Sequence, residues 1–122
     1  MKIFLIGPMG SGKSKIGRIL SEKLSISLFD IDKEIEKDLN MSITEIFASK
    51  GEIFFRNTET DYLIKTKGLR DCIVSTGGGV VEEIKNLEFL RKEANVVFLN
   101  CSVESQYENT KNSAKRPLLL TK

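Results

Sequence analysis

The chain has 122 residues, and its 19 basic and 17 acidic residues nearly cancel. That length fits one domain with a hydrophobic core of its own, which we place over residues 1–122. The basic residues form no block and no patch interleaved with aromatic side chains, so a nucleic-acid partner has little electrostatic support. The longest apolar runs are only strand length, which excludes a membrane-spanning helix. Because the chain opens on a core strand, we expect no signal peptide and a cytoplasmic protein, which we take to be a monomer.

The composition also narrows the chemistry. The chain contains no histidine, which removes Ser-His and Cys-His nucleophiles and histidine metal sites. Phosphoryl transfer needs none of these, because it depends on positioning and on neutralising phosphate charge with Lys, Arg and Mg²⁺. Cys72 and Cys101 each stand at the edge of a predicted buried strand, where free thiols are favoured over a disulfide.

The first predicted strand, at about 2–7, leads directly into a glycine-rich loop. Residues 7–14 read Gly-Pro-Met-Gly-Ser-Gly-Lys-Ser, a complete G-x-x-x-x-G-K-[ST] phosphate-binding motif, and a helix with apolar periodicity follows to about Ser25. In this motif the backbone amides cradle phosphates, Lys13 reaches the β- and γ-phosphates, and the Ser14 hydroxyl ligates Mg²⁺. A glycine turn without a ligand remains the alternative. The strand before the loop and the helix after it favour nucleotide binding.

Strands and helices then alternate. Further strands are predicted at about 27–31, 71–76 and 95–100. A helix is expected from Asp32 or Lys33. A capping box at Ser42 to Glu45 opens a short helix, which Gly51 breaks before a longer helix toward Thr66. Helices are also expected at about 82–92 and after Ser102. Near-continuously apolar strands separated by helices predict an α/β fold, a parallel sheet with helices on both faces. Its ligands gather at the carboxyl ends of the strands.

Two carboxylates leave the second predicted strand, in Phe29-Asp30-Ile31-Asp32. If the strand continued, alternation would place Asp30 and Asp32 on one side, directed at the same crevice. One of them could support hydrated Mg²⁺ while the other accepts a hydrogen bond or proton from an acceptor hydroxyl. The plainer interpretation is that one simply caps the next helix, and for Asp32 the two interpretations are nearly balanced.

Three glycines follow the third predicted strand, in Ser75-Thr76-Gly77-Gly78-Gly79. Such a run is often only a flexible turn. At the ligand end of a sheet it also exposes bare backbone amides and permits positive φ, so that a substrate can approach the main chain. The position favours a binding role for Gly77, Gly78 and Gly79.

Two arginines are candidates for anion binding. Arg56 follows Phe54 and Phe55; it forms either a surface ion pair with Glu52 or Glu59, or a more buried contact with a specific carboxylate. Arg116 stands in the polar, basic segment 109–122. This segment is either a solvated loop or, as we predict, a lid that closes over the nucleotide and brings Arg116 to the transferring phosphate.

Together these motifs resemble the shikimate kinases. The resemblance rests on the glycine loop, Phe-Asp-Ile-Asp with Ile35-Glu36, the segment from Ser42 to Phe47, Gly51-Glu52, Phe55-Arg56 with Glu59, residues 75–80 and Arg116-Pro117-Leu118-Leu119. Order and spacing match over nearly the whole chain. Adenylate and gluconate kinases share only the first motif.

The resemblance implies a P-loop kinase-like three-layer α/β/α fold with strand order 2-3-1-4, and transfer of the ATP γ-phosphoryl group to the 3-hydroxyl of shikimate. It implies catalytic roles for Lys13, Asp32 and Arg116. Asp32 would hold substrate hydroxyls and accept the proton, Arg56 would grip the substrate carboxylate, Glu59 would orient Arg56, and Gly77, Gly78 and Gly79 would supply donors. Ser14 and Asp30 would serve Mg²⁺. The ATP phosphates would be wrapped by Gly10, Ser11, Gly12, Lys13, Ser14 and Lys15 and met by Arg116.

The chain departs from the family at its C-terminus. Family members continue past the lid with a fifth edge strand, a second substrate-binding arginine and an adenine-binding loop, whereas this sequence ends at Lys122. Two other functions therefore stay open. One is a nucleotide-binding module with weak or no catalysis, and the other is a related kinase with a different small-molecule acceptor.

Overall fold

The computed structural model describes residues 1–8 and 10–99. Four predictions concern residues outside this part of the chain: the lid at 109–122 with Arg116, the thiol of Cys101, the helix after Ser102, and the last residue of the fourth strand. Among the described residues, no helix combines the length and the apolar character needed to cross a membrane.

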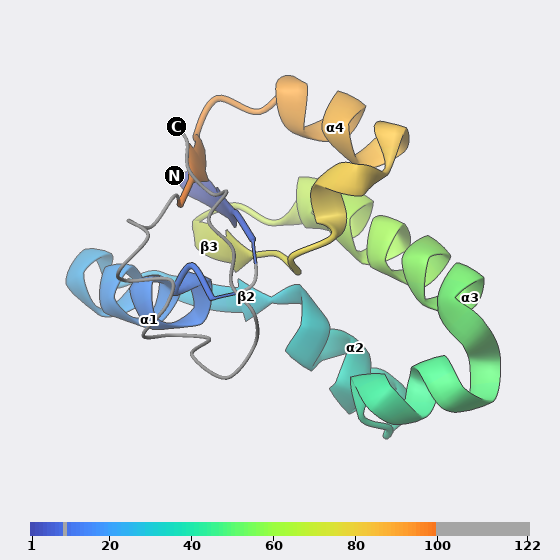
Figure 1. The fold of residues 1–122 in the computed structure, drawn as a ribbon. Helices are drawn as coiled ribbons and strands as arrows, with labels where there is room; N and C mark the ends of the chain where they lie inside the picture. The colour runs from blue at the N-terminus through green and yellow to red at the C-terminus, as the bar shows by residue number, and fades with distance from the viewer. Residues whose placement is uncertain (9, 100–122) are drawn as a thin grey trace.

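One parallel sheet organises the described chain. Its strands are β1 (Lys2–Ile6), β2 (Ser27–Asp30), β3 (Cys72–Ser75) and β4 (Val96–Phe98). Their order is β2-β3-β1-β4, and each neighbouring pair is parallel (Figure 1). This confirms the predicted 2-3-1-4 order, which puts β1 and β3 inside the sheet so that the loops after them share its carboxyl edge.

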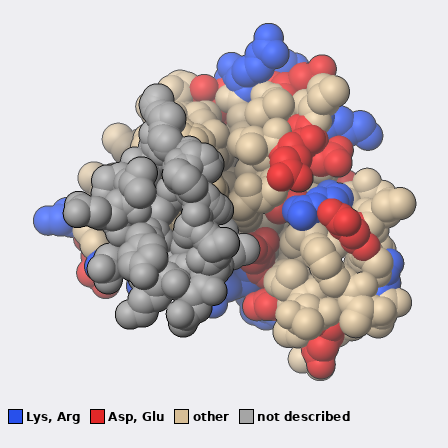
Figure 2. Space-filling view, viewed as in Figure 1, with Lys and Arg blue, Asp and Glu red and all other residues tan. Residues whose placement is uncertain are grey.

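Helices cover both faces of the sheet, as predicted. They are α1 (Lys13–Leu24), α2 (Ile31–Leu39), α3 (Ile43–Lys65) and α4 (Ile84–Arg91), with short 3₁₀ helices η1 (Thr66–Gly68) and η2 (Val80–Glu82). Figure 1 shows α1 on one side of the sheet and α3 with α4 on the other. Basic and acidic side chains lie interspersed over the coloured part of the surface in Figure 2.

The alternation of side chains along the strands explains the two packed layers. Phe4 on β1 pairs in register with Val74 on β3, and both are fully buried in the core that includes Phe55 and Leu63 of α3. Leu5 points to the opposite face, against α1. There Gly17 permits close packing, because a Cβ at this position would lie 3.0 Å from Leu28 Cδ1 and 3.5 Å from Leu5 Cδ1.

Local signals set the helix ends with one exception. The capping box is present, since Ser42 and Glu45 each accept a hydrogen bond from the other's backbone N–H. Gly51 breaks that helix as predicted: its φ of 89° and ψ of 164° are non-helical, and a second helical section of α3 follows directly. The second helix begins at Ile31, earlier than predicted, because Asp30 caps it.

Candidate active site

A cavity of about 440 Å³ opens at the carboxyl edge of the sheet. It brings together residues from the glycine loop, the start of α1, the end of β2, the start of α2 and the turn after β3. The sequence-predicted site residues that line it are Gly10, Gly12, Lys13, Ser14, Lys15, Asp30, Asp32, Gly77 and Gly78. The other described candidates, Ser11, Arg56 and Gly79, do not line the cavity; Arg56 and Gly79 lie against each other.

Two glycines of the loop have left-handed backbone conformations. Gly10 and Gly12 have φ of 84° and 86°, the left-handed region that side chains disfavour. Gly12 is also the N-cap of α1, and within the described residues no side chain caps this helix. The N-terminus of α1, where Ser14 and Lys15 line the cavity, therefore offers main-chain N–H groups and the positive end of the helix dipole to an anion.

Lys13 lies across the same loop. Its Nζ donates to the carbonyl oxygens of Gly7 at 2.6 Å and of Pro8 at 3.1 Å. These bonds hold the ammonium group over the residues that would surround a phosphate. A positive charge fixed beside left-handed glycines and a helix N-terminus is the arrangement that binds a polyphosphate.

Asp30 and Asp32 reach the cavity by a different route from the one predicted. The strand does not continue to Asp32, so strand alternation does not place them. Asp30 is the cap residue, and its Oδ1 accepts a hydrogen bond from the Lys33 backbone N–H at 3.2 Å. Asp32 does not cap α2 but lies in its first turn. Cap and first turn are adjacent, so both carboxylates still border one cavity.

The surroundings of Asp32 raise its pKa. Burial raises the pKa of this carboxyl, and the nearby charges of Asp30 and Glu36 raise it further, while Lys13 and Arg56 oppose the shift. Asp32 Oδ1 is buried and has no hydrogen-bond partner in the described chain. A carboxylate of this kind holds a proton more tightly than an ordinary aspartate, which suits an acceptor of a hydroxyl proton.

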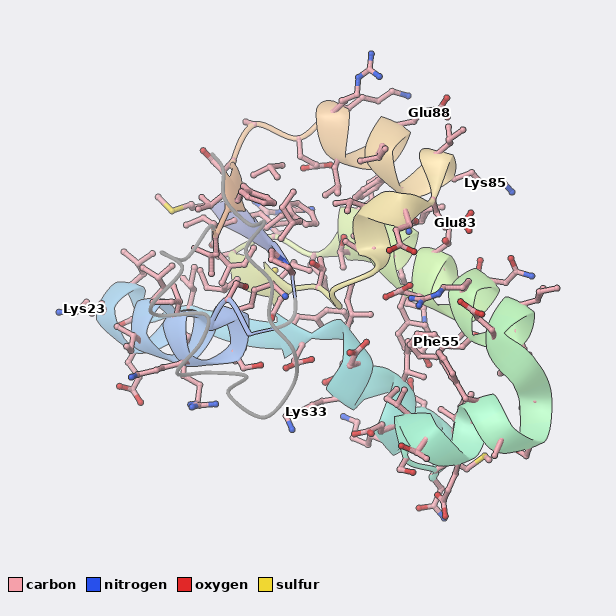
Figure 3. The ribbon with its side chains drawn as sticks, in the orientation of Figure 1. Lys23, Lys33, Phe55, Glu83, Lys85 and Glu88 are labelled. Atoms are coloured by element: carbon pink, nitrogen blue, oxygen red, sulfur yellow. The ribbon has the colours of Figure 1, made fainter. Side chains whose placement is uncertain are left out.

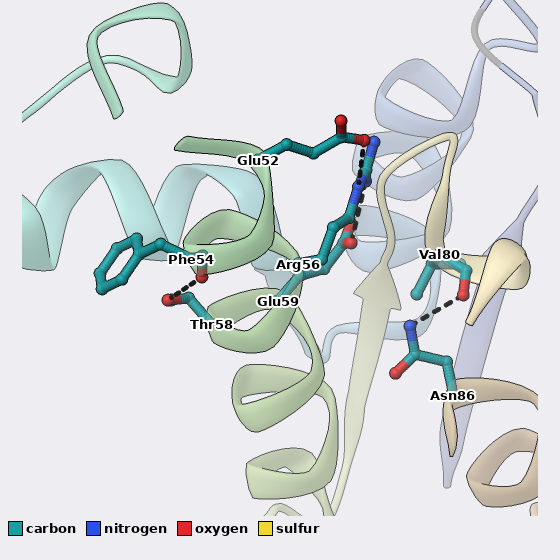
Figure 4. A network of polar contacts seen from close by, with 7 residues as sticks. All are labelled: Glu52, Phe54, Arg56, Thr58, Glu59, Val80 and Asn86. Carbon is teal, nitrogen blue, oxygen red and sulfur yellow. Dashed lines mark hydrogen bonds and ion pairs between the residues drawn. The ribbon is translucent and has the colours of Figure 1, made fainter. Parts of the chain in front are cut away.

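Arg56 is held between two glutamates of its own helix. Its Nη1 donates to Glu59 Oε1 at 3.1 Å, and its Nε lies 3.5 Å from Glu52 Oε2 (Figure 4). Both pairings that were expected of a surface arginine thus occur, yet the Glu59 side chain is only 1% exposed. The guanidinium lies 5.5 Å from the ring centre of Phe55 and 5.9 Å from that of Phe47. Arg56 is therefore fixed in a partly buried setting.

The apolar support for Arg56 differs in one residue from the expected pair. Phe55 is buried, and Figure 3 shows it in the angle between α2 and α3. Phe54, the other phenylalanine expected beside Arg56, is 37% exposed. Phe47, which lies in the section of α3 before Gly51, contacts Arg56 instead. Its ring centre lies 5.0 Å from that of Phe55. The kink at Gly51 separates these two sections of α3.

The glycine turn after β3 has a different physical basis from the predicted one. Among the described glycines, positive φ occurs at Gly7, Gly10, Gly12 and Gly51, so the turn does not use it. What the turn requires is the absence of Cβ atoms. A Cβ at Gly77 would lie 2.8 Å from Glu59 Oε2 and 3.2 Å from Asp32 Oδ1, and one at Gly79 would lie 2.8 Å from Arg56 Nη1. Backbone and charged groups meet here at close range.

Five further residues line the cavity without having been predicted as site residues: Lys33, Glu36, Ile43, Ser75 and Thr76. Glu36 stands one helical turn after Asp32, so helical spacing would have placed both on one face. Its Oε2 accepts from the Ile43 backbone N–H at 2.9 Å, which joins α2 to the start of α3. No sequence signal indicated Ile43, because its position depends on how the two helices pack.

The oxygen donors present suit a hard cation. Ser14 and Asp30 line the same cavity, and the capping bond of Asp30 uses Oδ1. No group of three or more acidic, Cys or His residues able to hold a metal occurs in the described chain. A small number of protein oxygens beside a phosphate-binding loop matches the way Mg²⁺ is bound, with substrate phosphates completing its coordination.

Comparison with known proteins gives a consistent result. A family model described as shikimate kinase matches residues 9–122. The shikimate kinase of Persephonella marina is 40% identical over 117 residues, covering 96% of this chain and 71% of that protein. The shikimate kinase of Methylococcus capsulatus is 41% identical over 119 residues, covering 98% and 66%.

A solved structure agrees with these sequences. The shikimate kinase of Acinetobacter baumannii in complex with shikimate superimposes with a TM-score of 0.83 at 39% identity, covering 89% of this chain and 61% of that one. The chain thus spans about two thirds of the length of the relatives it matches. With the loop, the paired carboxylates and the glycine turn in the order expected, the chain belongs to the shikimate kinase family.

Proposed function

We propose that the chain transfers the γ-phosphoryl group of ATP to the 3-hydroxyl of shikimate, giving shikimate 3-phosphate for chorismate and aromatic amino acid synthesis. The observation that carries the proposal is a single cavity bordered on one side by the phosphate loop and on the other by Asp32 and Gly77. Donor and acceptor can therefore meet within one cavity. The proposal includes a monomeric, cytoplasmic enzyme.

The donor side would act through the glycine loop. The backbone of residues 10–15 surrounds the ATP phosphates, and Lys13 neutralises charge that develops on the transferred group. Ser11 supports the loop from a buried position, 6% exposed. Arg116, outside the described residues, would complete this side as the lid closes.

Ser14 and Asp30 are the residues that would hold Mg²⁺, Asp30 through water. The ion, when bound, neutralises phosphate charge during transfer. The fold holds the Ser14 hydroxyl and the Asp30 carboxylate beside the phosphate loop. Asp30 is held there because the end of β2 and the start of α2 both fix its backbone.

The acceptor side would use Asp32 and Arg56. Asp32 accepts the proton of the attacking hydroxyl, for which its raised pKa is favourable. Arg56, oriented by Glu59, binds the substrate carboxylate, and one such charge-assisted contact contributes about 1.5–3 kcal/mol. Gly77, Gly78 and Gly79 bring bare backbone close to the substrate. Each role depends on the contacts between α2, α3 and the turn.

A second candidate is a nucleotide-binding module with weak or no catalysis. The observation in its favour is the phosphate loop, whose glycines and Lys13 account for nucleotide binding without an acceptor. The two candidates differ in whether ATP turnover depends on shikimate.

Coupled measurement of ADP release with and without shikimate tests the proposal. We expect shikimate-dependent release that Lys13→Met reduces by about two orders of magnitude or more, the usual cost of removing one electrostatic stabiliser. Lys23→Met is the matched control, since Lys23 lies at the far end of α1 (Figure 3). ATP binding without shikimate-dependent turnover would favour the second candidate. Turnover of an acceptor lacking a carboxylate, unaffected by Arg56→Ala, would indicate a related kinase instead.

A further inference from the structure

Asn86 is a fully buried polar residue that none of the proposed roles uses. It stands in the first turn of α4 with 0% exposure. Its Nδ2 donates to the Val80 carbonyl oxygen at 2.8 Å (Figure 4). The acceptor is a carbonyl, so the amide nitrogen must be the atom that faces it. The other amide atom, Oδ1, is buried and has no hydrogen-bond partner in the described part of the chain.

Val80 closes the glycine turn. Its own N–H donates to the Gly77 carbonyl oxygen at 3.2 Å, and the Glu82 N–H donates to that of Gly79 at 3.0 Å. These two bonds wind residues 77–82 into a tight turn that runs into η2. The bond from Asn86 attaches the end of this turn to α4, an element that does not itself line the cavity.

The position of the turn decides how the acceptor side is arranged. Gly77 lies against Glu59 and Asp32, and Gly79 lies against the Arg56 guanidinium. A displacement of the turn toward these side chains would push the charged groups apart, and a displacement away would open a gap between backbone and substrate. Even a small displacement of the turn backbone would therefore weaken substrate binding substantially.

A buried asparagine that leaves one polar atom unpartnered is a poor choice for packing alone, because an apolar side chain of similar shape avoids that desolvation cost. We propose that Asn86 is a positioning residue for the acceptor half of the site: its amide fixes the Gly77–Val80 turn against Arg56 and Asp32. The inference rests on the proposed function, since it assigns the turn to shikimate binding.

Asn86→Leu tests this role, with Asn95→Leu as the matched control. Asn95 also donates its Nδ2 to a backbone carbonyl, that of Lys2 at 3.4 Å, but it is exposed and far from the turn in the fold. We expect Asn86→Leu to raise the KM for shikimate about tenfold while the KM for ATP stays within about twofold, and Asn95→Leu to change neither. A purely structural role would lower thermal stability and leave the KM for shikimate unchanged.

Hydrogen exchange of the backbone amides tests the same role without turnover. We expect Asn86→Leu to speed exchange at Val80 and Glu82, while the amides of α1 keep their wild-type rates. Unchanged exchange and an unchanged KM for shikimate in a folded variant would overturn the inference. If the leucine variant does not fold, Asn86→Ser, which is too short to reach Val80, takes its place. Wild type without shikimate-dependent turnover would overturn the proposed function, and exchange then decides alone whether Asn86 orders the turn.

Discussion

The donor and acceptor halves of the cavity are built in different ways. The donor half is the contiguous run of residues 7–15, and its main features are left-handed glycines, backbone amides and one lysine folded over its own loop. The acceptor half combines the start of α2, the middle of α3 and the turn after β3, which side-chain contacts hold together. We therefore expect substitutions in the acceptor half to affect shikimate selectively and to act through several residues at once.

The largest effect in this half should come from Arg56→Ala. The loss of one charge-assisted contact costs about 1.5–3 kcal/mol, or roughly a ten- to hundredfold rise in the KM for shikimate. The KM for ATP should stay near the wild-type value, because the contacts of Arg56 with Glu59 and Gly79 belong to the acceptor side. Steady-state kinetics with each substrate varied in turn would show this split. Arg56→Lys should recover only part of the loss, since an ammonium group cannot hold Glu59 and a carboxylate in the same planar geometry.

A smaller effect is expected from Gly79→Ala. The added Cβ would lie 2.8 Å from Arg56 Nη1, and because the guanidinium is the end of a flexible side chain, it should move rather than unfold the protein. We expect a rise of about three- to tenfold in the KM for shikimate with little loss of stability. Gly68→Ala is the matched control, since a Cβ there meets nothing within 4 Å. Equal kinetics for the two variants would contradict a precise fit between the turn and Arg56.

The different construction of the two halves also explains why the sequence predicted the donor half better than the acceptor half. The glycine loop needs only local backbone conformations, and Gly10 and Gly12 have the positive φ that glycine permits there. The parallel sheet, predicted from the alternation of apolar strands with helices, was confirmed too, and so was the strand order that the resemblance implied. Periodicity could not show that Asp30 would take the cap and Asp32 the first helical turn, since a change from strand to helix at Ile31 depends on that cap.

Long-range packing accounts for the rest of what was missed. Phe47 reaches Arg56 across the break at Gly51, from the section of α3 that precedes it. The glycines of the turn were expected to supply positive φ, but their role is to avoid clashes with Glu59, Asp32 and Arg56, which are distant in sequence. Ile43 enters the cavity through a bond between its N–H and Glu36. None of these contacts has a local signature.

Glu59→Gln should separate stability from substrate binding. Burial raises the pKa of Glu59, although its pairing with Arg56 opposes the shift. The folded state thus binds the proton more tightly than the unfolded chain, so the stabilisation is complete below the unfolded pKa of about 4.5 and is lost as pH rises through the raised folded value. A neutral glutamine does not titrate, so the variant does not lose this stabilisation as pH rises. Its free energy of unfolding should exceed that of wild type at pH 7.

The same variant should bind shikimate less well. A neutral amide holds Arg56 about half as strongly as a carboxylate, so we expect a rise of about three- to fivefold in the KM for shikimate. Denaturant unfolding at pH 4 and pH 7 together with kinetics would measure both effects. A variant that is less stable than wild type at pH 7 would show that the Arg56 pair outweighs the burial of Glu59.

The smallest effect should come from Tyr62→Phe. Tyr62 on α3 donates its hydroxyl to Asp38 Oδ2 on α2 at 2.6 Å. Because this pair is exposed, Tyr62→Phe should cost about 0.5 kcal/mol of stability and leave both KM values unchanged. The hydrogen bond, burial and the charge of Asp38 raise the pKa of Tyr62 to about 12. Its stabilisation should therefore be constant below pH 10 and fade as pH rises toward 12, where the tyrosinate forms. Unfolding of wild type and variant across this range should give curves that converge at high pH. A change in the KM for shikimate would instead show that the Tyr62–Asp38 bond between α3 and α2 influences the acceptor half. The acceptor half would then include contacts that lie outside the cavity.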